Sequence, residues 1–130
     1  MTYEELSPEE EDIATALVDA AFKVHSSLGP GLLEKVYEIC LVHELEKAGY
    51  KAKRQVVIPI QYDDLVFEEG LRIDVMVNDL VIAEIKAVNQ ENPVWRAQIL
   101  SHLKLMNRRL GFVINFNVPT IKNGIRRVIL

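Results

Sequence analysis

Two helices are predicted in the first 50 residues by the spacing of their apolar side chains. Between Ile13 and Val24 an apolar residue recurs at every third or fourth position, which places a hydrophobic stripe along one side of a helix. Ser7-Pro8-Glu9-Glu10 is a helix start, because the serine can cap the helix, the proline fits the first helical position and the last glutamate can complete a capping box. The run 29–31, Gly-Pro-Gly, ends this helix, and a second helix is predicted from about Leu32 to Ala48.

After residue 50 the pattern becomes one of strands with a single further helix. Many β-branched residues occupy positions 55–62, where Pro59 indicates an edge strand or a bulge. The order ααβββαββ predicts an α+β (mixed α/β) fold with one central sheet, and the chain length of 130 residues fits a single domain over 1–130. The predicted elements are strands at 55–62, 71–77 and 80–88, a helix at 92–108, and strands at 111–117 and 125–130.

The pairing of the second and third predicted strands follows from the same pattern, because directly opposed residues of a hairpin share a face. A two-residue loop at Asn78-Asp79 would place Glu84 on the apolar face and leave Asp74 on the opposite one. A three-residue loop instead pairs Asp74 with Glu84, and it pairs Arg72 with Lys86. We predict the longer loop, and therefore two neighbouring carboxylates, since one face then becomes wholly apolar. That face would hold Ile73, Val75, Val77, Val81, Ala83 and Ile85.

Asp74, Glu84 and Lys86 form the strongest candidate site. Two adjacent carboxylates repel each other unless a proton or a cation lies between them, and such oxygen ligands suit Mg²⁺ or Mn²⁺. The ion can activate water and neutralise charge on a phosphate, while a nearby lysine supplies a positive charge for the attacking water or a phosphate oxygen. The simpler interpretation is a surface strand with alternating charges, because a short D…ExK pattern also arises by chance.

Two helical residues strengthen this candidate. Glu34 falls nearly in line with two leucines of the second predicted helix, and a carboxylate among core residues is costly unless a metal or a buried hydrogen bond compensates it. We expect Gln98 to point inward as well, where its amide would bind a metal-coordinated water, a phosphate or a backbone group. Its predicted helical stripe contains Val94, Trp95, His102 and Leu105.

Charge is distributed unevenly along the chain. The net charge is −4, which argues mildly against a nucleic-acid partner. Residues 85–130, however, carry eight lysines and arginines against one acidic residue, whereas residues 1–50 carry three against eleven. This C-terminal third is a candidate for phosphate binding, and it includes Arg96 and Lys104. The alternative is that these groups are solvated surface charges that balance the acidic half.

Other features of the sequence argue against several classes of protein. No run of 18 apolar residues is present, so no transmembrane helix is expected. The start Met1-Thr2-Tyr3-Glu4-Glu5 is acidic, unlike a secretory signal, so we expect a cytoplasmic location. Cys40 stands in an apolar helical context and is interpreted as a small buried hydrophobe. The three histidines are far apart, and no Gly-rich loop precedes a Lys-Ser/Thr pair, so neither a local zinc motif nor a P-loop is indicated.

The segment 25–38, His-Ser-Ser-Leu-Gly-Pro-Gly-Leu-Leu-Glu-Lys-Val-Tyr-Glu, resembles the signature of the GxxExxY family. The likeness covers nearly the whole chain, and that family is placed in the PD-(D/E)XK nuclease superfamily. It continues through Glu44-Leu45, Gly49, Arg54-Gln55, Pro59, Arg72-Ile73-Asp74, residues 84–88, Gln98 and residues 111–116.

The resemblance implies a restriction-endonuclease-like core, in which helices flank a central mixed sheet. It also implies Asp74 and Glu84 as metal ligands, with the Ile85 carbonyl as a third. Lys86 would position or activate the attacking water. Glu34 would be the helical acid of the site.

The resemblance further implies that Gln98 is the helical glutamine of exonuclease-like members. Those members often place a tyrosine four residues later, where this chain has His102. Arg72, Arg96, His102 and Lys104 are the residues expected to contact nucleic acid.

Three functions compete at this point. The first is metal-dependent hydrolysis of phosphodiester bonds in nucleic acid, with DNA as the expected substrate; Asp74, Glu84 and Lys86 favour it. The second is a non-catalytic binding or regulatory module with the nuclease fold, acting through a protein partner or a homodimer; the acidic net charge favours it. The third is a small-nucleotide phosphodiesterase, which mononucleotides but not duplex DNA would inhibit. Fold alone does not decide among them.

Overall fold

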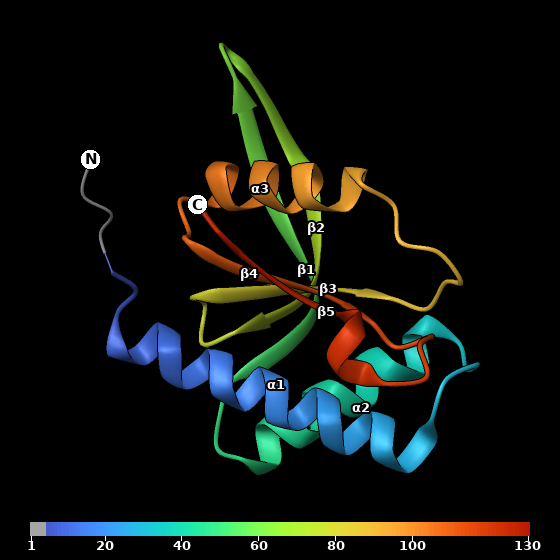
Figure 1. Cartoon of the computed structure of the whole chain (residues 1–130). Coiled ribbons are helices and arrows are strands. Elements are labelled where there is room, and N and C mark those ends of the chain that lie inside the picture. Colours follow the sequence, from blue (N-terminus) through green and yellow to red (C-terminus); the bar gives the residue numbers. More distant parts are fainter. Residues whose placement is uncertain (1–4) are drawn as a thin grey trace.

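A computed structural model describes residues 5–130, so the acidic start of the chain lies outside the described residues except for Glu5. Within them, three α-helices and one five-stranded mixed sheet follow in the predicted order ααβββαββ, with a short 3-10 helix added before the last strand (Figure 1). The elements are α1 Pro8–Leu28, α2 Glu34–Lys47, β1 Ala52–Tyr62, β2 Leu65–Val77, β3 Val81–Lys86, α3 Val94–Met106, β4 Leu110–Asn115, η1 Ile121–Gly124 and β5 Ile125–Ile129.

The start of α1 and the loop before α2 are fixed by local hydrogen bonds. The capping box is present, since Glu10 N donates to Ser7 Oγ (3.1 Å) and Ser7 N donates to a Glu10 carboxylate oxygen (2.7 Å). Gly29, at φ +67°, ends α1 in a conformation that suits glycine. The Tyr37 hydroxyl donates to Gly29 O (2.6 Å) and accepts from Leu32 N (3.1 Å). These bonds tie the Gly-Pro-Gly loop to α2.

The strands lie in the order β1-β2-β3-β4-β5, and only β3 and β4 run parallel. The segment between them contains α3, which crosses one face of the sheet, whereas α1 and α2 cover the other face (Figure 1). Pro59 lies in the edge strand β1, where the register with β2 shifts between Ile58 and Ile60, so both features indicated by that proline are confirmed.

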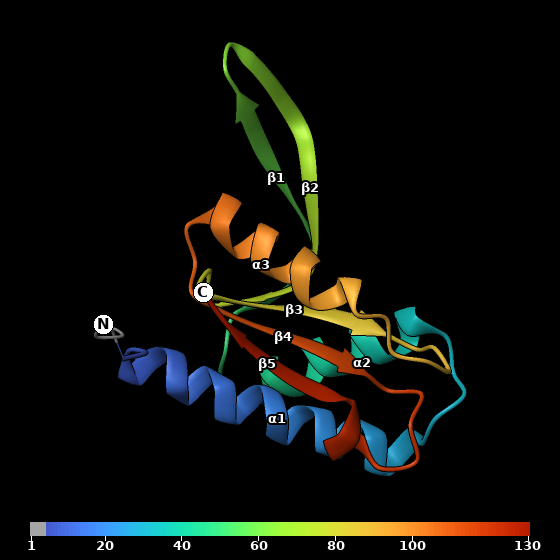
Figure 2. The same cartoon turned by 45° about the horizontal axis from the view of Figure 1, so that its top comes forward.

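The β1–β2 hairpin extends beyond the rest of the sheet (Figure 2). The strand predicted at 71–77 in fact begins at Leu65, because residues 65–67 pair with β1, although residues 65–70 are all exposed and lack a buried face. Gly70 fits this arm because an added Cβ would lie 2.6 Å from the Ile60 side chain.

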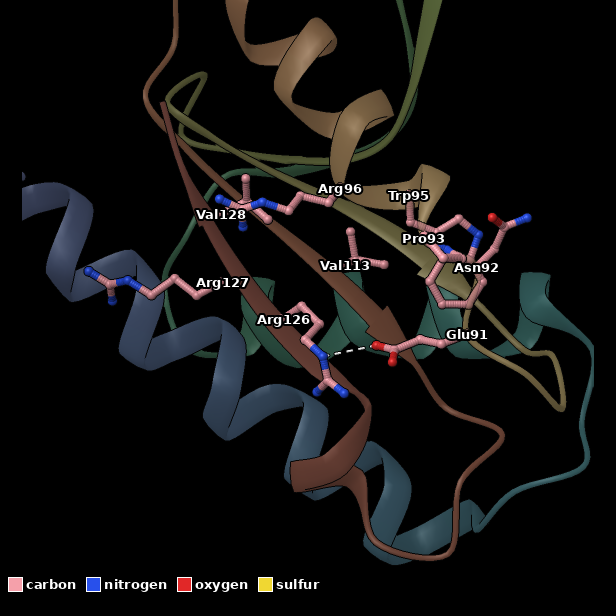
Figure 3. Close-up of a pocket in the computed structure, with 9 residues that line it drawn as sticks. All are labelled: Glu91, Asn92, Pro93, Trp95, Arg96, Val113, Arg126, Arg127 and Val128. Carbon is pink, nitrogen blue, oxygen red and sulfur yellow. Dashed lines mark ion pairs between the residues drawn. The ribbon is translucent and has the colours of Figure 1, made fainter.

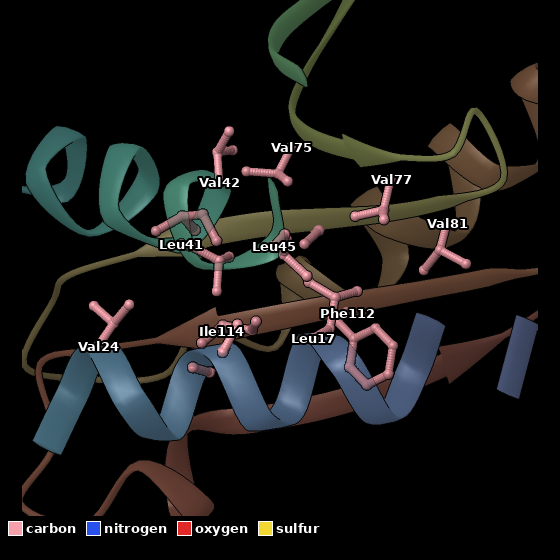
Figure 4. Packing of buried hydrophobic residues seen from close by; sticks show 14 of the residues in the cluster. Leu17, Val24, Leu41, Val42, Leu45, Val75, Val77, Val81, Phe112 and Ile114 are labelled. Carbon is pink, nitrogen blue, oxygen red and sulfur yellow. The ribbon is translucent and has the colours of Figure 1, made fainter. Parts of the chain in front are cut away.

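Two apolar clusters enclose the sheet. The larger lies between the sheet and α1–α2 and contains Leu17, Leu41 and Phe112, each at most 1% exposed (Figure 4). The smaller lies beneath α3 and includes Ile82 and Ile99. Both faces of the sheet are therefore covered. The predicted contrast between an apolar and a polar face of the β2–β3 pair is found only at the end of β3 that carries Glu84 and Lys86.

The predicted three-residue loop between β2 and β3 is confirmed. Val77 pairs with Val81, and the same register continues to Val75 with Ala83, where the paired segment ends. Beyond that point β2 follows β1 instead, so Arg72 pairs with Val57 and the predicted pairing of Arg72 with Lys86 is wrong.

Ile73 was also predicted on the wrong face. It packs in the cluster beneath α3, whereas Val75 packs in the cluster against α1 and α2. The cause lies at Gln55, which adopts a left-handed φ of +52° and makes no regular pair with Asp74. The interruption breaks the alternation of side chains along β2.

Candidate functional site

Asp74 occupies the opening where β2 leaves β3. Its Oδ2 atom accepts a hydrogen bond from Ile85 N (2.8 Å), and its Oδ1 atom lies 3.5 Å from Gln55 Nε2. A side-chain carboxylate thus takes the place of a backbone acceptor at the first position beyond the paired segment. This arrangement brings Asp74 to the main chain of β3 directly beside Glu84.

Glu34 and Glu38 approach Asp74 from the start of α2. The carboxylates of these three residues each place an oxygen within 4.8 Å of the others, and we refer to them as the acidic cluster. Glu34 is an exposed residue at the first position of α2, not a member of the core. The prediction that it lies among core side chains is therefore wrong, because the helix starts at this residue and its carboxylate faces the opening.

Glu38 was not singled out from the sequence. It is 2% exposed, and its Oε1 atom accepts from Arg54 Nε (3.1 Å) and Gln55 Nε2 (2.8 Å). The signal was available, since Glu38 lies one helical turn after Glu34 and three residues before buried Leu41. Gln55 links Glu38 to Asp74, so its irregular backbone has a direct effect on the geometry of the acidic cluster.

Glu84 lies in a largely desolvated position next to the acidic cluster. Burial raises the pKa of its carboxyl group to about 6; His102 partly offsets this effect, and Asp74 adds to it. Glu84 Oε1 lies 3.4 Å from His102 Nδ1, yet the two groups are not aligned for a hydrogen bond. Among the described residues, these two atoms are the buried side-chain polar atoms that lack a hydrogen-bond partner.

The electrostatics of this region suit a divalent cation. Burial raises the pKa of Glu34, and the nearby Asp74 and Glu38 carboxylates raise it further, while Lys86 lowers it. The carboxylates therefore disfavour one another's charged forms, and a cation would relieve that repulsion. A donor set of carboxylate oxygens, with the unsatisfied Oε1 of Glu84 beside it, fits hard ions such as Mg²⁺ and Mn²⁺.

Lys86 lies on β3 two residues after Glu84. Its Nζ atom stands 5.6 Å from the centroid of the Trp95 ring, a cation–π contact with α3. Its electrostatic effect on Glu34 places the lysine charge near the acidic cluster. A positive group is thus held beside the carboxylates by an aromatic ring.

Gln98 does not point inward as predicted. It is exposed, and the buried residues of α3 are Ile99 and Leu103. The stripe was misplaced because α3 carries apolar side chains around most of its circumference, and Val94, for example, is 45% exposed. Periodicity therefore did not identify a single buried side of this helix.

The residues expected to contact nucleic acid lie at four separate places. Arg72 is exposed on β2, His102 is half-buried beside Glu84, and Lys104 is exposed on α3. Arg96 lines a hollow at the start of α3. Only His102 is therefore in direct proximity to the carboxylates.

Comparison with known families gives the identity of the fold. A model of the PD-(D/E)XK nuclease superfamily matches residues 11–128 of the chain. The protein therefore belongs to the PD-(D/E)XK nuclease superfamily, and its helices and mixed sheet form an α+β, restriction-endonuclease-like fold. No curated protein and no solved structure matches the chain. Within residues 5–130, no helix is both long and apolar enough to cross a lipid bilayer.

Proposed function

We propose that this protein is a divalent-metal-dependent nuclease that hydrolyses phosphodiester bonds in nucleic acid, with DNA as its substrate and Mg²⁺ or Mn²⁺ as its cofactor. The observation that carries the proposal is the position of Asp74 in the opening between β2 and β3, bonded to Ile85 N beside the desolvated Glu84. Membership of the PD-(D/E)XK superfamily supports the same chemistry.

Asp74 and Glu84, together with the main-chain carbonyl of Ile85, would hold the ion in this proposal. Such an ion, when bound, supplies an activated water and neutralises charge on the phosphate. Lys86 would hold the attacking water or a phosphate oxygen, since its ammonium group is fixed over Trp95. Glu34 would accept a proton, because its carboxyl group has a raised pKa and faces the same opening.

Residues of α3 complete the proposed site. Gln98 is exposed and so is free of the core to contact a phosphate, and His102 would donate to a phosphate or orient Glu84. Arg72, Arg96 and Lys104 would bind the nucleic-acid backbone at a greater distance, each as an exposed cation.

Further parts of the proposal rest on the sequence. The Gly-x-x-Glu-x-x-Tyr run at 31–37 supports placement in the GxxExxY family. A single domain over 1–130 is proposed on the length of the chain, and a cytoplasmic location is proposed together with the nuclease function. A homodimer is proposed because it would present two sites to one nucleic-acid molecule.

A binding module without catalysis is the second candidate, favoured by the net charge of −4. To separate the two, labelled DNA and RNA single strands, duplexes, flaps and junctions would be incubated with the protein in Mg²⁺, Mn²⁺ or EDTA. Asp74→Asn and Lys86→Ala would be tested beside Glu46→Gln, which alters an exposed carboxylate at the end of α2.

We expect metal-dependent cleavage that falls by about a hundredfold or more in both site variants and persists in the control. Mn²⁺ binding measured by calorimetry should weaken with Asp74→Asn but not with Glu46→Gln. Absence of cleavage in every arm, together with Mn²⁺ binding unaffected by Asp74→Asn, would refute the nuclease and leave the binding module.

A further inference from the structure

A hollow of about 530 Å³ lies on the α3 side of the sheet and takes no part in the proposed chemistry (Figure 3). It is formed by the loop before α3, the first turn of that helix, and strands β4 and β5. We refer to it as the α3 groove. Its volume is in the range of small-ligand sites and is far too small for a nucleic-acid duplex.

The floor of the α3 groove is apolar. Val113 and Val128 belong to the cluster beneath α3, and Pro93 and the half-buried Trp95 form the adjoining wall. Apolar and aromatic surface of this kind binds the flat face of a nucleobase, whatever the base, since every base has a π-face. A paired and stacked base in a duplex does not present that face.

The rim of the groove is positively charged. Arg96 and Arg126 lie on opposite sides of the floor, on α3 and β5 (Figure 3). Arg126 Nε is 2.9 Å from a carboxylate oxygen of Glu91, and both side chains are about half exposed. An exposed ion pair of this type contributes little stability, so a phosphate can replace Glu91 as the partner of Arg126.

The α3 groove is linked to one candidate catalytic residue, Lys86, through Trp95. Trp95 lines the groove, and its ring also lies 5.6 Å from Lys86 Nζ. A base held against Trp95 would therefore lie close to the residue proposed to hold the reacting phosphate or its attacking water.

We propose that the α3 groove binds an unstacked base of a single-stranded nucleic-acid segment. Trp95 stacks on the base, while Arg96 and Arg126 bind the flanking phosphates. This inference rests on the proposed function for its link to Lys86, and it assigns that function a single-stranded or locally unpaired substrate. DNA and RNA share the necessary chemistry, so both are included in the test.

Trp95 is the single tryptophan of the chain, so its fluorescence reports on this groove directly. The protein would be titrated in EDTA with oligo(dT), oligo(U), a duplex and an abasic strand of equal length, and binding would be followed in parallel by anisotropy of a labelled strand. Saturable quenching by oligo(dT), oligo(U) or both, and much weaker quenching by the duplex and the abasic strand, is expected. Binding without quenching, equal quenching by the abasic strand, or no binding at all would overturn the proposal.

Variants assign the contacts. Trp95→Ala should weaken single-strand binding by about tenfold, and Trp95→Phe, which keeps a stacking ring, should restore most of it. Arg96→Ala should reduce the salt dependence of binding by about 0.7 in the log–log slope. Glu91→Gln should tighten binding several-fold because it releases Arg126 Nε from the carboxylate, while Arg126 Nη1 keeps its bonds to Asn123 O and Ile125 O. Lys23→Ala removes an exposed charge from α1, on the other face of the sheet, and should change nothing.

A negative result in the binding assay and a negative result in the cleavage assay refute different proposals. Quenching without cleavage would retain the α3 groove and refute the nuclease. Cleavage without quenching, or tight binding that Trp95→Ala leaves unchanged while circular dichroism shows an intact fold, would refute the groove alone.

Discussion

The two ends of the β2–β3 pair differ in what they bury and in how the strands are joined. At the turn, Val75–Val77 pair with Val81–Ala83 through a regular ladder, and these side chains are buried. At the other end the strands separate. There the Asp74 carboxylate accepts a hydrogen bond from Ile85 N, beside Glu84, in place of a main-chain bond of the ladder. Apolar pairing at one end therefore fixes the register that delivers the carboxylates to the other, so stability and chemistry are divided along one pair of strands.

Substitution in the core should have the largest effect on stability and should not affect the acidic end. Phe112→Ala removes a side chain that is 1% exposed in the cluster against α1, and we expect it to lower the free energy of unfolding by about 3–5 kcal/mol. Phe67→Ala is the matched control, because Phe67 is 50% exposed on the hairpin arm and should cost less than about 1 kcal/mol. Urea unfolding measures both. Equal losses would show that the arm is as tightly packed as the core.

Neutralising Glu84 should raise the free energy of unfolding of the metal-free protein, in contrast to the loss expected for Phe112→Ala. Burial raises the pKa of this carboxyl group from 4.5 to about 6, so the stability it contributes is fully present below pH 4.5 and is lost as the pH rises through 6. In EDTA at pH 7.5, Glu84→Gln should therefore be more stable than the wild type by up to about 2 kcal/mol, and at pH 4 the difference should vanish.

The measurement is the unfolding free energy at the two pH values, with Glu46→Gln as an exposed control. Mn²⁺ should stabilise the wild type but not Glu84→Gln, because the substitution removes a proposed ligand. A Glu84→Gln variant that is less stable than the wild type at pH 7.5 in EDTA would contradict the desolvated position of this carboxylate.

Substitution of Gln55 should have the smallest effect on stability, but it should still alter the acidic cluster. Gln55→Gly relieves a left-handed φ of +52° but removes the hydrogen bond to Glu38, and two opposing effects of about 1 kcal/mol each should nearly cancel. Mn²⁺ affinity should fall several-fold, because Glu38 and Asp74 lose their connecting amide. Gln61→Gly, at an exposed β1 position, should leave Mn²⁺ affinity unchanged. Unchanged affinity in Gln55→Gly would show that this amide does not position the acidic cluster.

The register of β2 and β3 was predictable because it depends on a strong and local signal. Alternation of apolar side chains selects the loop that pairs Val77 with Val81, and no other part of the chain is needed for that inference. The proximity of Asp74 to Glu84 follows directly. The extent of the pairing was not predictable, because the departure of β2 toward β1 depends on the backbone of Gln55 in a different strand.

The contributions of helices to the site were less accessible from sequence. Glu38 carried a signal in its spacing from Glu34, but its burial depends on Arg54 and Gln55, which reach it from β1. The spacing of apolar residues around Gln98 was misleading, because α3 is apolar around most of its circumference and contacts the sheet along a narrow line. Long-range contacts decide both cases, and periodicity within one helix does not contain them.

The position of β3 has a consequence for the encounter with a substrate. The sequence is net acidic up to Glu84 and net basic from Lys86 onward, and this boundary falls inside a central strand of the sheet. Most of the acidic excess lies on α1 and α2 and on the hairpin, whereas arginines gather on β5 and the start of α3. The elements on the two sides of this strand in the sequence therefore carry net charges of opposite sign. An approaching polyanion would be turned toward the α3 face before any contact forms, and added salt would remove that orientation without changing the site itself.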